Sequence, residues 1–182
     1  TGTALATTIA LAPSPVNFAN QRVGTTSGST TVTVTNLDTV TATLSAGTPV
    51  TIAGGNAADF AILGTTTCTA SFVIPANGGT CVINLTFTPS ATGARTTTLS
   101  IASTATGSPH TATLNGTGIL ANVALAPNPL NFGNQRQSVT SASQTITVTN
   151  SGSENSTLAA VNPVTISGAN SGDFAIVGGT TT

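Results

Sequence analysis

The sequence contains an internal repeat with a period of 114 positions. Phe18 and Phe132 are 114 positions apart, and the same offset aligns residues 9–67 with residues 123–181 without a gap. Somewhat more than half of the aligned positions are identical. A fixed period of this size indicates tandem domains. About 110 residues is the usual length of one β-sandwich domain, so the period predicts one sandwich per repeat.

The alignment also predicts the domain boundaries. Residues 1–3 align, at the same offset, with residues 115–117, so 1–8 is interpreted as the last strand of an upstream repeat with its linker. Residues 9–118 then form a complete immunoglobulin-like repeat, and 119–182 an incomplete second one. Half a sandwich cannot cover its own apolar face. We therefore expect that either more chain or a neighbouring molecule completes it.

Strand patterns dominate each repeat. Residues 31–35 alternate threonine with valine, which predicts a strand with Val32 and Val34 inward and the hydroxyls outward. Residues 81–87 predict another strand with Cys81 and every second residue after it on one face. Turns rich in Gly, Pro, Asn and Asp separate the strands, and the many β-branched residues favour sheet over helix. The pattern predicts an all-β fold of tandem immunoglobulin-like β-sandwiches.

A combination of motifs resembles a known family. The motifs are Pro15–Phe18, Val32–Asn36, Ile52–Gly54, Asp59–Ile62, Cys68 and Cys81 before Leu85–Pro89, and Leu114–Gly118. Together they resemble the ASPM-SPD-2-Hydin-type immunoglobulin-like repeats of bacterial surface proteins of the choice-of-anchor D kind. The resemblance covers essentially the whole chain, and it implies a structural or interaction module without catalytic residues. The second repeat departs from it at Thr182, which aligns with Cys68.

Charged residues are scarce. They make up 4% of the chain, against roughly 25% in an average domain, and the net charge is −1. The three cations, Arg22, Arg95 and Arg136, cannot neutralise a run of phosphates, so no nucleic-acid partner is expected. No apolar run reaches the roughly 20 residues of a membrane span, so none is expected in this segment. The absence of Met, Trp and Tyr fits an extracellular or cell-surface protein.

Cys68 and Cys81 are the only cysteines, and they bracket a loop and a hairpin. In an exported protein a disulfide is the expected state of such a pair. A metal site would need further soft ligands, and His110 is the only histidine. We expect no metal, no cofactor and no catalytic residue, and we interpret His110 as an exposed residue at the entry of a strand.

Residues that recur in both repeats have structural interpretations. The predicted core anchors are Phe18, Phe60, Phe87, Phe132 and Phe174. Asp59 and its counterpart Asp173 are predicted to cap turns by accepting backbone N–H groups. Arg22 and Arg136 recur within Asn-Gln-Arg and are candidate interdomain contacts, with simple solvent exposure as the alternative.

The outward threonines leave glycosylation open. O-glycans on a threonine-rich surface make glycans a further candidate partner. N-glycan triplets occur at Asn84, Asn115 and Asn155, although such triplets are expected by chance in this composition. Ice binding is disfavoured, because it needs a flat surface and sandwich sheets twist.

A chain that repeats itself gains length or many copies of one surface. We therefore predict a non-enzymatic structural module of a long extracellular repeat protein that forms a bacterial surface stalk, fibre or filament. Its expected partners are copies of itself or neighbouring repeats, joined by short linkers rich in proline, by lateral association or by strand donation. The alternative is an adhesive module that recognises carbohydrate or a host surface, against which the lack of Trp and Tyr counts.

Overall fold

The structure is a computed structural model that describes residues 8–178. It divides the chain into two units, unit 1 up to Leu120 and unit 2 from Ala121, and each is described by itself. The upstream strand expected at 1–8 lies, except for Thr8, outside the described residues.

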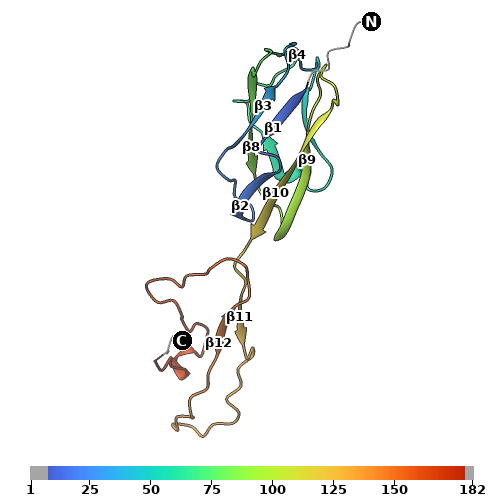
Figure 1. The fold of residues 1–182 in the computed structure, drawn as a ribbon. Helices are drawn as coiled ribbons and strands as arrows, with labels where there is room; N and C mark the ends of the chain where they lie inside the picture. The colour runs from blue at the N-terminus through green and yellow to red at the C-terminus, as the bar shows by residue number, and fades with distance from the viewer. Residues whose placement is uncertain (1–7, 179–182) are drawn as a thin grey trace, which may run out of the picture. The chain divides into compact units, whose positions relative to one another are not determined.

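Unit 1 is a β-sandwich of two four-stranded sheets (Figure 1). The first sheet has the order β1 (Ile9–Ala12), β3 (Thr30–Asn36), β8 (Thr80–Phe87) and β6 (Phe60–Ile62). The second has the order β2 (Val16–Arg22), β10 (His110–Ile119), β9 (Gly93–Ile101) and β5 (Val50–Ala53). A small sheet pairs β4 (Ala42–Thr43) with β7 (Val73–Ile74), and a 3₁₀ turn, η1 (Ala57–Asp59), precedes β6. The all-β, immunoglobulin-like fold expected from the sequence is confirmed.

The central strands of the first sheet follow the alternation in the sequence. Val32 and Val34 of β3 are fully buried and lie opposite Ile83 and Cys81 of β8 in antiparallel register. The threonines between the valines are exposed or half-buried. Burial of each valine side chain stabilises the fold by about 1.5–3 kcal/mol. Burial of these alternating apolar side chains therefore both favours the strand and builds the apolar layer between the sheets.

A glycine in β10 lets that strand pack against the core. A Cβ atom at Gly116 would lie 2.5 Å from Cε1 of Phe87, closer than non-bonded carbons approach. The register between β10 and β2 shifts between Asn115 and Thr117, on either side of this glycine. The ring of Phe87, which is fully buried, fills the space that a side chain at position 116 would need.

Unit 2 repeats part of the local structure of unit 1. Its elements are β11 (Val123–Ala126), β12 (Thr147–Asn150) and the 3₁₀ turn η2 (Ser171–Asp173). β11 and β12 pair antiparallel with Val123 opposite Asn150. This is the register of β1 and β3, in which Ile9 lies opposite Asn36, moved by 114 positions.

The turn after β12 also matches its counterpart in unit 1. Nδ2 of Asn150 donates to the backbone oxygen of Glu154, and the N–H of Gly152 donates to Oδ1 of Asn150. Asn36 makes the same two hydrogen bonds, with the residues four and two positions further along. An asparagine side chain that bonds the backbone after it stabilises a turn locally, so both turns form although the residues that follow, 37–40 and 151–154, differ.

The connection between the two units is short. Residues 120–122 separate the end of β10 from the start of β11. The prolines expected in this link, Pro127 and Pro129, instead follow β11 within unit 2. The prediction of a short linker is confirmed, whereas the prediction that it is rich in proline is wrong.

Candidate functional site

The two cysteines form a disulfide, as predicted. The sulfurs of Cys68 and Cys81 are 2.01 Å apart, and both residues are buried. Cys81 belongs to β8, and Cys68 lies in the segment between β6 and β7. The backbone N–H groups of Thr67 and Cys68 both donate to the oxygen of Val82. The disulfide therefore fixes this segment to the sheet, and its buried sulfurs fit a structural rather than a redox role.

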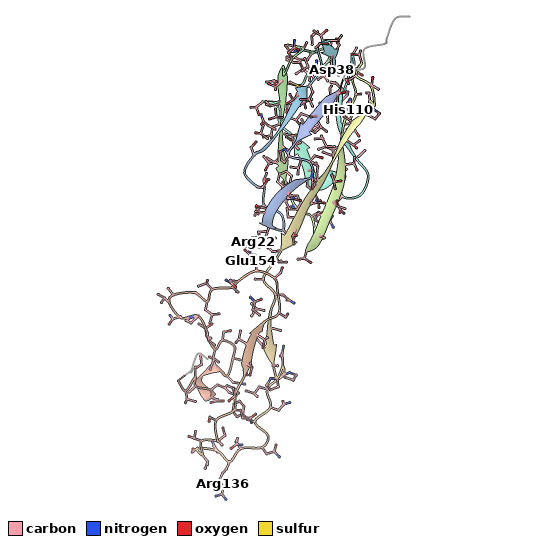
Figure 2. All side chains as sticks on the ribbon, viewed as in Figure 1. Arg22, Asp38, His110, Arg136 and Glu154 are labelled. Atoms are coloured by element: carbon pink, nitrogen blue, oxygen red, sulfur yellow. A yellow bond between two sulfur atoms is a disulfide. The ribbon has the colours of Figure 1, made fainter. Side chains whose placement is uncertain are left out.

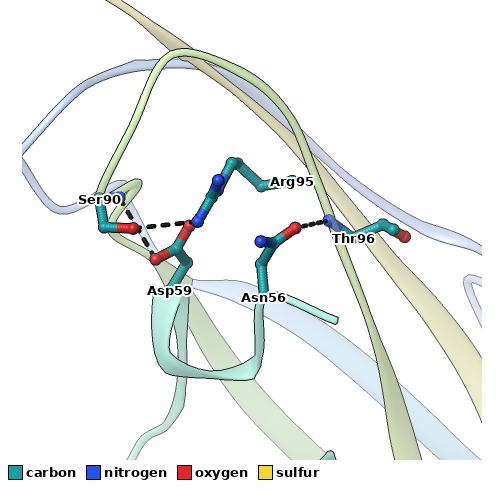
Figure 3. A network of polar contacts seen from close by, with 5 residues as sticks. All are labelled: Asn56, Asp59, Ser90, Arg95 and Thr96. Carbon is teal, nitrogen blue, oxygen red and sulfur yellow. Dashed lines mark hydrogen bonds and ion pairs between the residues drawn. The ribbon is translucent and has the colours of Figure 1, made fainter. Parts of the chain in front are cut away.

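A polar network joins η1 to β9 and to the loop before β9 (Figure 3). Nε of Arg95 donates to Oδ2 of Asp59, and Nη2 of Arg95 donates to Oγ of Ser90 at 3.0 Å. The N–H of Ser90 donates to Oδ1 of Asp59 at 3.2 Å. Beside this pair, the N–H of Thr96 donates to Oδ1 of Asn56 at 3.0 Å. The side chains of Asp59 and Arg95 are 3% and 18% exposed, so the ion pair is largely shielded from water.

The environment of Asp59 lowers the pKa of its carboxyl group. Burial raises this pKa, because it disfavours the charged form. The hydrogen bonds from Arg95 and Ser90 and the positive charge of Arg95 act in the opposite direction and together outweigh burial. The pKa of Asp59 therefore lies below its ordinary value of 3.8, and the carboxylate is ionised in the folded protein at neutral pH.

The carboxylate of Asp59 accepts a backbone N–H group, as predicted, but from Ser90 and not from a residue of its own turn. The turn η1 has no side-chain cap hydrogen bond. The carboxylate instead reaches Ser90 and Arg95, which are 31 and 36 positions further along the chain. Sheet topology brings these residues together, and no short-range pattern encodes it. The small number of charged residues could have indicated the pair. In a chain with 4% charged residues, a buried aspartate has few cationic residues to pair with.

His110 is half-buried rather than exposed. It is the first residue of β10 and lies opposite Ile101 of β9. Its Nε2 has no hydrogen-bond partner in the described part of the chain, and burial lowers the pKa of the imidazole from its ordinary value of 6.5. A histidine in this setting is neutral at physiological pH.

Three of the four phenylalanines of unit 1, Phe18, Phe60 and Phe87, form one aromatic cluster. The ring centroids of Phe18 and Phe60 are 5.6 Å apart, and that of Phe87 lies 5.7 Å from Phe18 and 4.9 Å from Phe60. Phe60 and Phe87 are buried, and Phe18 is half-buried. In unit 2 the rings of Phe132 and Phe174 are 5.9 Å apart, but Phe174 is exposed. The ring contact therefore recurs in unit 2 with Phe132 half-buried, as Phe18 is, and the burial differs only between Phe174 and Phe60.

Ionisable side chains are few and widely spread (Figure 2). Arg22 ends β2 and Arg136 lies between β11 and β12, and both residues are exposed. The carboxylate of Asp38 accepts a hydrogen bond from the N–H of Thr8 at 2.8 Å. Within residues 8–178, no group of three or more His, Cys, Asp or Glu side chains could hold a metal ion. No helix in the same range has the length and apolar character needed to cross a membrane.

The outer face of the second sheet of unit 1 carries hydroxyl and amide groups. Thr51, Ser100 and Thr111 lie side by side across β5, β9 and β10. Two shallow hollows of about 340 and 430 Å³ lie on this face and share Asn115. The first is lined by Asn17, Phe18, Ala94, Arg95, Thr96, Asn115, Gly116 and Thr117, and the second by Ser14, Pro15, Thr98, Thr111, Ala112, Thr113 and Asn115. The groups suit hydrogen bonding to a neutral, hydroxyl-rich ligand.

Among the described residues of unit 2, the counterparts of two core side chains of unit 1 are exposed. Val148 and Phe174 are 45% and 51% exposed, whereas their counterparts in unit 1, Val34 and Phe60, are 0% and 6% exposed. In unit 1, β3 pairs with β1 on one side and with β8 on the other. Among the described residues of unit 2, β12 pairs with β11 alone.

Comparisons with known proteins find matches among solved structures. No family model matches the chain, and a search of curated proteins finds no match. Among solved structures, the ASH/PapD-like domain 7 of human CEP192 is similar, with 17% identity, a TM-score of 0.45, and coverage of 67% of this chain and 92% of that one. WR4, an MSP family member of C. elegans, gives 11% identity, a TM-score of 0.37, and coverage of 60% and 96%.

A third similar structure is the secreted serine protease VesC of Vibrio cholerae. The identity is 20% and the TM-score 0.47, and the match covers 65% of this chain but 24% of the protease. At these identities and TM-scores the comparisons carry no argument about function, so the fold rests on the strand order described above. They do not confirm the ASPM-SPD-2-Hydin-type family, and membership of that family stays a prediction.

Proposed function

We propose that the chain is a structural module of a long extracellular repeat protein that forms a stalk, fibre or filament on a bacterial surface. The observation that supports this most is the recurrence in unit 2 of the strand register and the asparagine turn of unit 1. Serial copies of one module add length and present one surface many times. A link of residues 120–122 spans at most about 11 Å, so little free chain separates successive modules.

The disulfide and the low charge also support an extracellular filament. Disulfides persist in oxidising compartments and are rare in the bacterial cytoplasm, so the bond between Cys68 and Cys81 favours an exported protein. A net charge of −1 leaves little self-repulsion between copies of the chain. Modules of this kind can therefore pack closely side by side or end to end.

Electron microscopy of native material tests the proposal. Untagged protein taken directly from its source, without denaturation, is expected to show regular filaments with a repeat near one or two module lengths, at about 40 Å per module. Compact monomers, or isolated strings of beads that do not associate, would contradict a filament. The same preparation treated with reductant shows whether the disulfide is needed for the assembled form.

An adhesive module is the second candidate, and the hydroxyl-rich face of unit 1 favours it. The two hollows that share Asn115 offer amide and hydroxyl groups to a neutral glycan. A glycan-binding screen with the 182-residue chain tests this function. Binding that is lost in Asn115→Ala and kept in Thr33→Ala, a change on the opposite sheet, would support it. An absence of binding to any neutral glycan would contradict the adhesive function, and the structural function would then be the single remaining candidate.

A further inference from the structure

Three Asn-x-Ser/Thr triplets in the chain have the pattern that accepts an N-linked glycan, and the structure distinguishes them. They begin at Asn84, Asn115 and Asn155. An enzyme that modifies such a triplet must reach the asparagine amide and the hydroxyl two positions later, so an acceptor belongs in a surface loop. The environment of each triplet therefore decides whether the folded protein can be modified there.

The triplet at Asn84 lies within β8, between β3 and β6. Nδ2 of Asn84 donates to the backbone oxygen and to Oγ1 of Thr65, each at 3.1 Å. Oδ1 of Asn84 accepts a hydrogen bond from Oγ1 of Thr31 at 2.7 Å, and Thr86, the hydroxyl residue of the triplet, is buried. A sugar on Nδ2 would displace Thr65, so the fold protects this triplet.

The triplet at Asn115 lies within β10, between β2 and β9. Nδ2 of Asn115 donates to Oδ1 of Asn17 at 3.0 Å, and Oδ1 of Asn115 accepts from Oγ1 of Thr96 at 2.9 Å. The amide therefore links β10 to both neighbouring strands. The middle residue, Gly116, is buried against the ring of Phe87. This triplet is also held within a sheet.

The triplet at Asn155 differs from the other two in each of these respects. It lies in irregular chain after the asparagine turn that follows β12, and its members Asn155, Ser156 and Thr157 are all exposed. Among the residues that the structure describes, the side chain of Asn155 makes no hydrogen bond. An exposed amide of this kind is open to an enzyme without any opening of a sheet.

The counterpart of Asn155 in unit 1 is exposed as well. At the offset of 114 positions this counterpart is Thr41, which lies on the surface of a sandwich that has both its sheets. Thr43, the counterpart of Thr157, is half-buried at the end of β4. The exposure of Asn155 therefore agrees with the position of this residue in a two-sheet module.

We propose that Asn155 is an N-glycosylation site and that the fold limits modification to this triplet. The transfer forms a bond between Nδ2 of Asn155 and the anomeric carbon of a sugar that a glycosyl diphosphate donates. The bond between that carbon and the phosphate oxygen of the donor breaks, the diphosphate leaves with the electron pair, and the amide loses one proton. The glycan goes beyond the proposed function, because neither a filament nor an adhesive module requires one.

Mass spectrometry of the native protein tests the site. Trypsin cuts after arginine and lysine, and the chain has three arginines and no lysine. The three triplets therefore fall in separate peptides, namely 23–95, 96–136 and the peptide that begins at Gln137. We expect a mass increase of whole sugar units on the last of these, located on Asn155 by electron-transfer fragmentation. Asn84 and Asn115 should be unmodified.

Two variants produced in the source organism separate an N-linked glycan from a sugar on a nearby hydroxyl. Asn155→Gln and Thr157→Ala should each abolish the mass increase, whereas Thr157→Ser, which keeps the triplet, should retain it. All three change exposed side chains and leave the fold intact. An unmodified Asn155 in the native protein would overturn the proposal, and so would a glycan that persists in Asn155→Gln.

A transfer assay tests the selection by the fold. The unglycosylated 182-residue chain is incubated with a soluble N-glycosyltransferase that recognises Asn-x-Ser/Thr and with a nucleotide-activated hexose. Synthetic peptides centred on the three triplets give the rates without a fold. Asn84 and Asn115 should react at least about tenfold more slowly in the folded chain than in their peptides, because their modification needs local opening of a sheet. Asn155 should react at nearly its peptide rate, and equal retardation of all three would overturn the proposal.

Discussion

Arg95 on β9 donates a hydrogen bond from Nε to the carboxylate of Asp59 beside β6, and the two residues are 36 positions apart. The contact joins the two sheets of the sandwich, because β6 belongs to one sheet and β9 to the other. It is a largely buried ion pair in a chain that has few charges. A buried ion pair costs desolvation energy when it forms. The loss of one partner, however, leaves the other charge buried and uncompensated, so substitution of either residue should be strongly destabilising.

Asp59→Asn should destabilise unit 1 by about 3 kcal/mol, because the guanidinium of Arg95 loses its counter-charge in a shielded position. The chain has no Trp or Tyr, so urea unfolding is best followed by far-UV circular dichroism. Hydrogen exchange of the β8 and β9 amides shows that the loss occurs in unit 1. The matched change Asp173→Asn alters an exposed carboxylate in unit 2 and should leave the exchange of β9 unaffected. Equal effects of the two changes would mean that the ion pair contributes nothing specific.

The same pair predicts a dependence of stability on acid. The pKa of Asp59 is lower in the folded protein than its ordinary value of 3.8, so its contribution to stability is fully present above pH 3.8. The contribution is lost as the pH falls through the folded pKa, because the proton then weakens the bond to Arg95. The melting temperatures of the wild type and Asp59→Asn should differ most at neutral pH and converge at strongly acidic pH. A difference that stays constant down to pH 2 would assign the effect of the substitution to packing.

Loss of the disulfide should destabilise unit 1 by about 3 kcal/mol. A cross-link that closes a loop of this size lowers the entropy of the unfolded chain, and its removal returns that entropy. The separation of Cys68 and Cys81 is 13 positions, and a reductant should lower the melting temperature by about 10 °C. The double variant Cys68→Ala/Cys81→Ala should melt at the reduced value and show no further response to reductant. A full response in the double variant would show that the reductant acts elsewhere.

The sequence predicted most of what depends on neighbouring residues. Alternation predicted which residues of β3 and β8 point inward, among them Val32 in β3 and Phe87 in β8. The asparagine turn after β3 recurs after β12 with the same hydrogen bonds, because Asn36 and Asn150 bond to the backbone that directly follows them. Features of this kind form in both units, since their determinants lie within a few residues.

Contacts between distant segments were beyond the reach of these patterns. The pairing of Asp59 with Arg95 and the strand order depend on which segments meet in space. Burial shows the same limit, because Phe60 and Phe174 occupy equivalent places in the repeat but only Phe60 is buried. In unit 1 the strands β8 to β10 complete the two sheets around Phe60, and the described residues of unit 2 include no counterparts of these strands.

Truncation of equivalent phenylalanines should therefore have unequal effects. Phe60→Ala should cost about 4 kcal/mol, because it leaves a cavity beside Phe87 in a packed core. Phe174→Ala should cost less than about 1 kcal/mol, because that side chain is largely exposed. Urea unfolding of both variants, with hydrogen exchange to separate the units, measures the contrast. Similar losses in both would mean that Phe174 is buried in solution, by a partner or by association of copies.

Gly116→Ala should destabilise unit 1 by about 3 kcal/mol, because the new methyl group would collide with the ring of Phe87. Gly28→Ala is the matched control, since a Cβ atom there meets nothing within 4 Å, and it should be neutral or slightly stabilising. The double variant Gly116→Ala/Phe87→Leu should lose less stability than the sum of the losses in the two single variants. The smaller leucine side chain makes room for the methyl group. Circular dichroism melts of the four proteins measure this coupling. Strict additivity would show that the glycine is needed for its backbone at the register shift, and that its contact with Phe87 is incidental.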